Sequence, residues 1–392
     1  MNSLAENHAQ AEHRVLPPTT HDEFARQEFV RSFKEHLVKH VHGGNRAVYE
    51  AKVKPAFQKQ HQRAPQTRFE VRDAMVREPH YQMFSTLLRT SQEMMWSSCQ
   101  IPVQRNLSAL NKAVAKRPKK TRGTLTLDAT LETPKYHTAV DIHCQPGGYH
   151  TEFVADDASA GMVYDRAVHL YAMGQMGPYN NDIGASIVGW LKHQHPTFKP
   201  QRILDLGCSV GHSTVPYAEA FPKAEIYAID VAAPMLRYAH ARAEDLGVRI
   251  HYSQQNAEHT NFADGSFDLV VSHILLHETS QTALQNIMRE CQRLLGPGGL
   301  MVHAETPPYK GMDPFDAFLL DWDTRNNNEP FWARSHEIDL RALSQQAGFD
   351  PDLKFEELIP SAFQIAKAQR SNKFQGGDFG GGGLWFIYGN RK

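Results

Sequence analysis

The stretch Ile203-Leu204-Asp205-Leu206-Gly207-Cys208-Ser209-Val210-Gly211-His212-Ser213-Thr214 decides the fold of this chain. An apolar run closes on an acid, a glycine-rich turn follows, and a helical pattern begins at once. This order is typical of a parallel strand that leads into the N-terminus of a ligand-binding helix. Gly207 and Gly211 allow a tight turn and a close approach of the backbone. The same letters also spell G-x-S-x-G, the nucleophile elbow of serine hydrolases, with Ser209 as the nucleophile.

Beyond this stretch, strand-like runs alternate with helical patterns. Apolar runs are found at 226–229, 248–252, 267–272 and 300–304, with helical patterns around 212–221, through 235–239 and from about 279 or 280. This alternation predicts right-handed βαβ units and a mostly parallel sheet. Residues 305–335 interrupt this alternation of strands and helices. A helix is expected over 336–347, and strands over 354–359 and 384–388, the last one after the glycine loop 376–383.

The N-terminal part of the chain follows other patterns. Residues 1–20 are polar and end near Pro17-Pro18, which predicts a disordered tail. Helical periodicity then continues to about residue 115. Alternating residues at 124–128 and 137–143 predict a β-hairpin. The predicted fold class is therefore α/β: a Rossmann-like, mostly parallel sheet over 151–392, preceded by a helical and hairpin region over 21–150 that caps the site or forms a homodimer.

Composition excludes several classes of protein. The chain has 392 residues and a formal net charge of −1, which gives no reason to expect a nucleic-acid partner. Its four cysteines are scattered, as expected for a reduced, cytoplasmic protein. The N-terminus lacks the apolar segment of a secretory signal. No run approaches the ~18–20 apolar residues that span a bilayer, so no membrane partner is expected.

Polar residues stand at the ends of the predicted strands. Asp205 closes the first strand, and Asp230 closes the second, 19 residues beyond Gly211. Asn256 follows the third strand, and Ser272 with His273 ends the fourth. Ligands of open α/β sheets bind at these carboxyl ends. An acid at Asp230 suits two ribose hydroxyls, and an amide at Asn256 suits an adenine edge.

Five motifs in order carry a resemblance to a known family: 203–211, 227–230, 256–258, 264–270 and 295–299. This set resembles class I S-adenosylmethionine-dependent methyltransferases, and most closely the small-molecule branch that includes ubiquinone and menaquinone C-methyltransferases. The resemblance covers roughly residues 160–390. It implies S-adenosylmethionine as the cofactor, a reversed hairpin at the end of the sheet, and methyl transfer to a small organic acceptor in specialised metabolism. Ser209 replaces a usual glycine and Asn256 a common aspartate.

The resemblance also implies roles for individual residues. The cofactor is expected to contact Tyr164, Tyr179, Asp205, Gly207, Ser209, Gly211, Asp230, Val231, Met235, Asn256, Ala257 and Ser272. Candidate general bases, needed only for some acceptors, are His273, His277 and Glu278. The segment 305–335 is expected to be a substrate lid, with the acceptor held by Trp322, Arg325, Glu329 and Trp332.

Alternatives remain open at this point. A domain that binds the cofactor without methylating would have the same motifs, and a serine hydrolase using Ser209 or a nicotinamide dehydrogenase fits fewer of them. His143, Cys144, His150 and Glu152 match no standard ligand spacing, so no metal site is expected. The basic run 116–122 would suit an acidic carrier protein that presents the acceptor.

Overall fold

The computed structural model describes residues 9–116, 121–371 and 384–392. Within them, eight strands form one sheet in the order β1-β4-β3-β2-β5-β6-β8-β7. The pairs among β1 to β6 are parallel, whereas β8 runs antiparallel to both β6 and β7. The predicted mostly parallel sheet with an antiparallel C-terminal strand is confirmed. The strands are β1 (Thr124–Thr126), β2 (Arg202–Leu206), β3 (Glu225–Asp230), β4 (His251–Gln254), β5 (Phe267–His273), β6 (Leu295–Glu305), β7 (Lys354–Pro360) and β8 (Leu384–Arg391).

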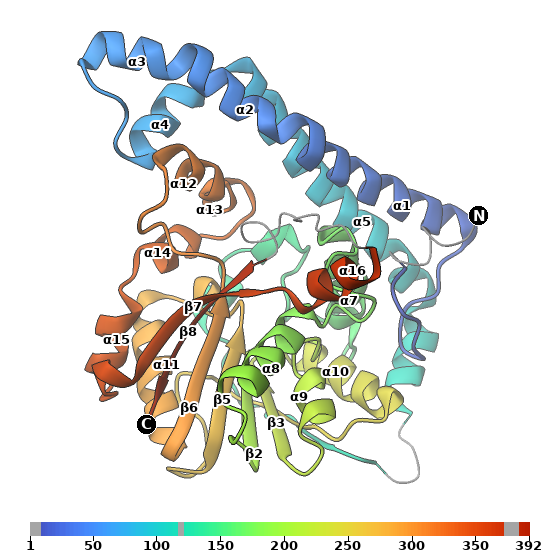
Figure 1. Ribbon diagram of the computed structural model, residues 1–392. Coiled ribbons are helices and arrows are strands. Elements are labelled where there is room, and N and C mark those ends of the chain that lie inside the picture. The colour runs from blue at the N-terminus through green and yellow to red at the C-terminus, as the bar shows by residue number, and fades with distance from the viewer. Residues whose placement is uncertain (1–8, 117–120, 372–383) are drawn as a thin grey trace.

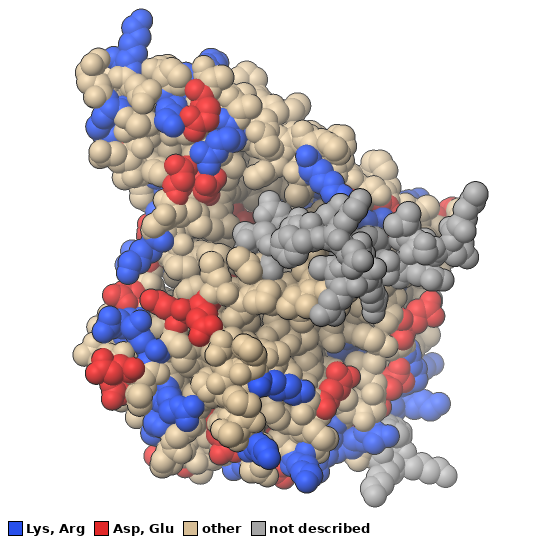
Figure 2. All heavy atoms as spheres, viewed as in Figure 1, with Lys and Arg blue, Asp and Glu red and all other residues tan. Residues whose placement is uncertain are grey.

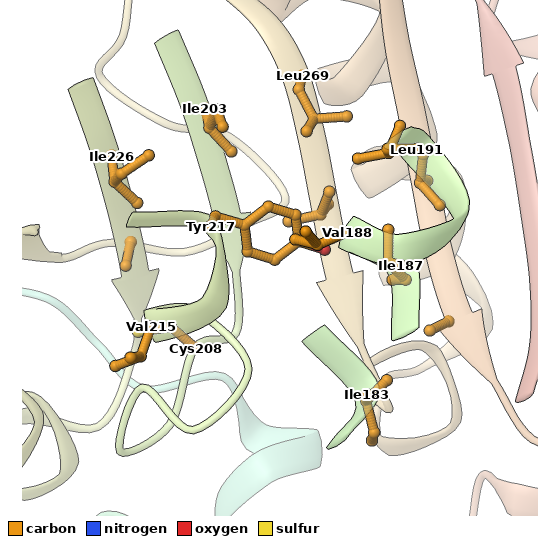
Figure 3. Packing of buried hydrophobic residues seen from close by; sticks show 14 of the residues in the cluster. Ile183, Ile187, Val188, Leu191, Ile203, Cys208, Val215, Tyr217, Ile226 and Leu269 are labelled. Carbon is orange, nitrogen blue, oxygen red and sulfur yellow. The ribbon is translucent and has the colours of Figure 1, made fainter. Parts of the chain in front are cut away.

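Helices cover both faces of the sheet, which is why its central strands carry buried apolar side chains on both faces. Ile203 of β2 packs on one face against Ile187 of α8 (Asp182–Gln194) and Tyr217 of α9 (Val215–Ala220), as Figure 3 shows. Leu204 of β2 faces the other side, in the cluster that includes Met288 of α11 (Gln281–Leu294). Successive side chains of a strand point to opposite faces, so one apolar strand stabilises two cores.

The N-terminal helices form a long arm beside the sheet (Figure 1). The chain runs through α1 (His21–His36), η2 (Leu37–Val41), α2 (His42–Val48), η3 (Tyr49–Val53) and α3 (Lys54–His61), then returns through α4 (Arg68–Met75) and α5 (Pro79–Ala115). Near the sheet, α5 packs on α7 (Ser159–Tyr171). At the far end, Tyr49 and Val71 share an apolar cluster with Phe315 of α12 (Pro314–Leu320). The arm and the segment 305–335 therefore support each other.

The remaining helices are short or surround the site. They are α6 (Lys135–Thr138), η4 (Ile142–Cys144), α10 (Ala233–Leu246), η5 (Leu276–Glu278), α13 (Trp322–Asn326), α14 (Trp332–Glu337), α15 (Leu340–Gln346), η6 (Pro351–Leu353) and α16 (Ala362–Ser371). No helix of the described ranges is long and apolar enough to cross a membrane. On the face drawn in Figure 2, basic and acidic side chains are interspersed, in keeping with the net charge of −1.

The predicted hairpin over 124–143 is wrong. Its first strand is β1, which pairs in parallel with β4 at the edge of the sheet. The second half forms α6, which begins after Pro134, and η4. His143 and Cys144 have φ values of 54° and 61°, in the left-handed region, so the chain there is not extended. Proline at a helix start and left-handed residues both oppose a strand.

Two further expectations need correction. Residues 9–20 were expected in a disordered tail, yet Val15 is fully buried and Gln10 hydrogen-bonds to Asp165. The helix expected over 336–347 divides into α14 and α15, because Ile338 between them is extended, with a ψ of 140°. Residues 1–8 of the predicted tail and the glycine loop 376–383 lie outside the described residues.

Candidate active site

The glycine-rich loop after β2 adopts a conformation that most residues avoid. Gly207 and Gly211 have φ values of 66° and 76°. A Cβ atom at Gly207 would lie 2.6 Å from a methyl carbon of Leu275, and one at Gly211 would lie 2.5 Å from the Tyr252 hydroxyl. Ser209 also has a positive φ, of 51°. This residue therefore occupies a glycine-like position with a side chain small enough to fit.

Asp230, at the end of β3, is tied to this loop through the backbone. The N–H of Ser209 donates to one carboxylate oxygen and the N–H of Ala232 to the other, both at 2.9 Å. Burial raises the pKa of Asp230, although these two hydrogen bonds oppose the rise. Each oxygen retains a lone pair for a ligand hydroxyl.

A cavity of about 120 Å³ lies over the carboxyl ends of the central strands. Gly207, Ser209 and Asp230 line it, as do Val231, Asn256, Ala257, Tyr164, His273 and Glu278, all predicted site residues. Its volume is below the 300–1,000 Å³ typical of small-molecule sites. Tyr136 and Tyr149, from the segment between β1 and α7, also line it. The two acceptor oxygens of Asp230 fit the ribose hydroxyls of S-adenosylmethionine. The glycine loop fits a part of the cofactor that lies close to the protein backbone.

Five predicted cofactor contacts lie outside this cavity. Asp205 is buried beneath it, where Thr214 Oγ1 donates to its Oδ2 at 2.5 Å. Ser272 Oγ lies 2.7 Å from Nδ1 of buried His303. Gly211 shapes the loop without lining the cavity. The other two are Met235, which packs in the core between α10 and α7, and Tyr179, which is 38% exposed.

The predicted bases differ in what they can do. Both nitrogens of His273 are engaged, Nδ1 with Asp205 at 3.1 Å and Nε2 with the Tyr217 hydroxyl at 3.0 Å. His277 is fully buried and pairs through Nδ1 with Glu305 at 2.7 Å. Burial opposes its charge, but Glu305 and Glu329 together raise the pKa of His277 above its ordinary value. His273 is thus fixed in a hydrogen-bond chain, whereas His277 keeps Nε2 without a partner.

Glu278 joins the cofactor cavity to the segment before α7. It accepts a hydrogen bond from the Tyr149 hydroxyl at 3.2 Å, and Nε2 of His143 lies 3.2 Å from the same carboxylate. Burial would raise the pKa of Glu278, but His143 and His277 hold it below its ordinary value. A carboxylate held in this way is a hydrogen-bond acceptor at neutral pH.

A second cavity of about 290 Å³ adjoins the first, with His143, Tyr164 and Ile274 lining both. Its walls are mainly apolar and aromatic, and the side chains of His277 and Asp323 also face it. The aromatic and apolar lining residues include Met95, Trp96, Tyr171, Met176, Ile183, Trp332 and Trp385. Size, apolar walls and a few polar groups are the features of a small-molecule site.

The predicted acceptor contacts are only partly brought to this cavity. Trp332 lines it. Glu329 is buried behind it, 2.9 Å from Nδ1 of His143. Trp322 instead donates to Ser85 Oγ at 2.8 Å and packs on the N-terminal arm, and Arg325 is exposed. The sequence brings His143 to notice only beside Cys144, His150 and Glu152, because its partners Glu278 and Glu329 are far away in the chain.

Two alternative sites are not assembled. Across the described ranges, no histidine hydrogen-bonds to the Ser209 hydroxyl, as a serine hydrolase would require. Of the four residues considered for a metal, two have other partners: Cys144 Sγ lies 3.7 Å from an Asn327 oxygen, and Glu152 pairs with Arg237.

Comparison with known proteins agrees with this geometry. A family model described as a methyltransferase domain matches residues 203–299. Demethylmenaquinone methyltransferase of Thermus thermophilus is 35% identical over 109 residues, 28% of this chain and 49% of that protein. Malonyl-[acyl-carrier protein] O-methyltransferase of Methylococcus capsulatus is 34% identical over 121 residues, 30% of this chain and 41% of that protein. The chain thus spans about half or less of the length of these two relatives.

A longer match extends over most of another relative. Ubiquinone biosynthesis O-methyltransferase of Dinoroseobacter shibae is 30% identical over 192 residues, 47% of this chain and 74% of that protein. Among solved structures, Haemonchus contortus phosphoethanolamine N-methyltransferase 2 with S-adenosyl-L-methionine is 17% identical and covers 58% of this chain and 57% of that chain, with a TM-score of 0.42. The chain belongs to the S-adenosylmethionine-dependent methyltransferases.

Proposed function

We propose that this protein transfers a methyl group from S-adenosylmethionine to a small organic acceptor in a biosynthetic reaction. The observation that carries the proposal is the pair of adjoining cavities, which share the walls formed by His143, Tyr164 and Ile274. One has the polar strand-end groups that suit the cofactor, and the other has the apolar walls that suit an acceptor. Methyl transfer depends mainly on in-line positioning of the two and on exclusion of water.

We assign cofactor binding to the residues around the first cavity. The two oxygens of Asp230 accept the ribose hydroxyls, and the loop from Gly207 to Ser209 brings backbone close to the methionine part. Asn256 and Ala257 flank the adenine. The side chain of Asn256 also accepts from the Glu258 N–H at 2.9 Å, so its amide group contacts the base from a fixed position.

Proton removal is needed where the acceptor is a hydroxyl or a carbon acid. We assign this role to Asp323, whose carboxyl group lines the acceptor cavity. Burial, together with the charge of Glu329, raises the pKa of Asp323 to about 7, which is close to the value that suits a general base. The predicted bases His273 and Glu278 do not line this cavity.

Titration with S-adenosylhomocysteine tests the cofactor assignment. Binding to the full chain is expected to raise its melting temperature, by a stabilisation of roughly 2.7 kcal/mol at a hundred times Kd. Asp230→Ala removes two charge-assisted contacts and is expected to weaken binding by at least about 100-fold. Glu225→Ala, at the exposed start of the same strand, serves as the control and keeps full affinity. Unchanged affinity in Asp230→Ala contradicts the assignment.

Product analysis tests the reaction itself. Incubation with cofactor and a library of small phenols, acids and amines is expected to give a product heavier by one methylene, and Asp323→Asn slows its formation for hydroxyl acceptors. A protein that binds S-adenosylhomocysteine but methylates neither free nor carrier-bound acceptors fits the non-methylating alternative instead.

The acceptor is proposed to be free or carried by a protein. The carrier-bound form is supported by the relative whose name specifies a malonyl-acyl carrier protein. Of the basic run 116–122 that would contact a carrier, residues 117–120 lie outside the described residues. Comparison of free and carrier-linked acyl acceptors at equal concentration separates the two cases.

Assembly and location are also proposals. Exposed Phe24, Phe29 and Phe69 on the N-terminal arm support a homodimer through this region. Sedimentation analysis of wild type and a Phe29→Ser variant tests it, since loss of an apolar contact favours the monomer. All four cysteines are free and buried, which supports a cytoplasmic, reducing setting.

A further inference from the structure

Three side chains from distant parts of the chain meet at the junction of the two cavities. His143 lies in η4, His277 in η5, and Glu329 in the loop between α13 and α14. Each offers one nitrogen or oxygen atom, and these atoms lie within 4.8 Å of one another. The side chains of His277 and Glu329 are 0% and 1% exposed. Two imidazoles and one carboxylate are a ligand set that divalent transition metals bind in proteins.

Two of these atoms are buried without a hydrogen-bond partner. His277 Nε2 and Glu329 Oε2 face each other at 3.8 Å, too far apart for a hydrogen bond. Leaving buried polar groups unpaired costs about 1–3 kcal/mol each, and more for a charged group. A cation between the imidazole nitrogen and the carboxylate oxygen would satisfy both.

The opposite nitrogens of both histidines are held by further carboxylates. His277 Nδ1 pairs with Glu305 at 2.7 Å, which directs the lone pair of Nε2 toward Glu329. His143 Nε2 pairs with Glu278 at 3.2 Å, which leaves Nδ1 toward Glu329 at 2.9 Å. Metal-binding histidines are commonly oriented by a carboxylate on the other ring nitrogen in this way.

The fixed charges around the cluster also favour a cation. Glu278, Glu305, Glu329 and Asp323 contribute four carboxylates, all near His143 and His277. The nearby buried Lys34 donates to Gln92 at 2.9 Å. Three of the four carboxyl groups pair directly with the two imidazoles, so acidic groups outnumber the histidines of the cluster.

We propose that His143, His277 and Glu329 bind one divalent transition-metal ion of the zinc and iron(II) class. Metal–ligand bonds of about 2.0–2.2 Å in a tetrahedral site place ligand atoms about 3.3–3.6 Å apart, so each of the three side chains needs to move by roughly 1 Å or less. Asn327 Nδ2 already donates to Glu329 and Asp323, at 2.8 and 3.0 Å, and steadies the carboxylate side of the site. His143 and His277 both line the acceptor cavity, so an oxygen atom of a bound acceptor would be the further ligand.

The competing explanation is an ion pair without metal, in which a protonated His143 lies between Glu278 and Glu329. Zinc and cobalt(II) titrations of the untagged, chelator-treated full chain distinguish the two. Calorimetry is expected to give one tight equivalent of zinc, and cobalt(II) is expected to give the visible bands of a nitrogen- and oxygen-ligated ion. Failure of the chain to take up either metal favours the ion pair and overturns the proposal.

Variants locate the site. Glu329→Gln and His277→Gln are each expected to weaken zinc binding by at least about 100-fold. Glu305→Gln, which changes a positioning residue, is expected to weaken it by about 10–100-fold. The control is a double change, His36→Gln with His40→Gln, which removes an exposed pair of histidines on one helix face with ring centroids 4.9 Å apart. Full zinc binding in the control is expected, and loss there instead of in Glu329→Gln overturns the proposal.

Two measurements keep the result clear where a variant folds poorly. S-adenosylhomocysteine binding reports the fold of each variant, because Glu329, His277 and Glu305 do not line the cofactor cavity. X-ray absorption on the zinc-loaded wild type needs no variant, and it is expected to show scattering from two imidazoles. A spectrum without imidazole scattering overturns the metal site and leaves the methyl-transfer proposal intact.

Discussion

Asp165 of α7 is the residue whose replacement best tests how this fold is held together. Its side chain is 1% exposed and has five hydrogen-bond partners, of which Asn180 is the most distant, at 3.4 Å. Gln10 Nε2 and His212 Nε2 lie 2.8 Å from Oδ1, while the Tyr238 hydroxyl and His13 Nε2 lie 2.7 and 3.0 Å from Oδ2. One carboxylate thus joins the N-terminal segment, α10 and the glycine-rich loop. We consider the change Asp165→Asn.

The expected loss of unfolding free energy in Asp165→Asn follows from a buried cation beside this carboxylate. Arg242 Nε lies 3.6 Å from Asp165 Oδ2, and the arginine side chain is 2% exposed. Its Nε and Nη1 atoms have no hydrogen-bond partner, so its charge depends on Asp165. Removing one partner of a buried pair costs about 3–5 kcal/mol. Because both groups are buried, this estimate needs no reduction for solvent screening, and we expect Asp165→Asn to lose about 4 kcal/mol.

Urea unfolding of the two proteins measures this loss. The control is Asp156→Asn, whose carboxylate pairs with Arg237 at 2.9 Å but is 90% exposed, so its free energy of unfolding is expected to stay within about 0.5 kcal/mol of wild type. Adding Arg242→Met to Asp165→Asn removes the uncompensated charge and is expected to restore part of the loss. A loss below about 1 kcal/mol in Asp165→Asn, with an unchanged denaturant slope, refutes the reasoning.

The deficit also depends on pH in a defined direction. Burial would raise the pKa of Asp165, but His212, His13 and Arg242 hold it well below its ordinary value. A carboxyl group with a depressed folded-state pKa stabilises the fold above its unfolded value, near 3.9, and loses this contribution as the pH falls. Asp165→Asn should therefore show its full deficit at pH 7 and a smaller one below pH 4.

Two further changes have defined outcomes. Gly211→Ala places a Cβ on a backbone with a φ of 76°, within 2.5 Å of the Tyr252 hydroxyl. It should lower the free energy of unfolding in urea by at least about 1 kcal/mol and weaken S-adenosylhomocysteine binding. The control Gly189→Ala, in a helix with open space around it, should raise the free energy of unfolding by about 0.5–1 kcal/mol. Burial lowers the pKa of His303 to about 4, so as the pH falls the unfolded chain binds a proton at this residue before the folded chain does. The free energy of unfolding of wild type should therefore fall by about 2 kcal/mol between pH 7 and 5, a loss that His303→Gln does not show. Parallel profiles of unfolding free energy against pH in the two proteins would contradict this.

The cofactor half of the site follows from local sequence signals. Gly207, Ser209, Asp230 and Asn256 each stand at or just beyond the end of a predicted strand, and all line the first cavity. Neighbouring parallel strands bring their carboxyl ends to one edge, so the spacing along the chain is enough to place them together. Predicted cofactor contacts that do not line the cavity include Met235, whose side-chain orientation depends on how α10 packs against α7.

Other expectations were wrong because a local sequence pattern can indicate a strand or a polar segment but does not specify what that segment packs against. The segment 124–126 has the alternation of a strand, and it is one, but its partner is β4, which begins at His251. A hairpin is the nearest partner in sequence, not the one that tertiary packing selects. Likewise, the polar composition of residues 9–20 predicts disorder, whereas the hydrogen bonds of Gln10 and His13 to Asp165 provide an ordered position for the segment.

The acceptor half of the site depends on contacts between distant parts of the chain, which hydrophobic periodicity does not predict. Glu329 was predicted to contact substrate from a lid, yet it lies against His143 because α12 and α13 pack on the N-terminal arm, where Phe315 and Trp322 join the cluster of Tyr49. The arm therefore sets where the lid segment meets the sheet. It follows that changes far from both cavities, in the arm, should alter acceptor choice while leaving cofactor affinity intact, since the Asp230 loop is built from β2 and β3 alone.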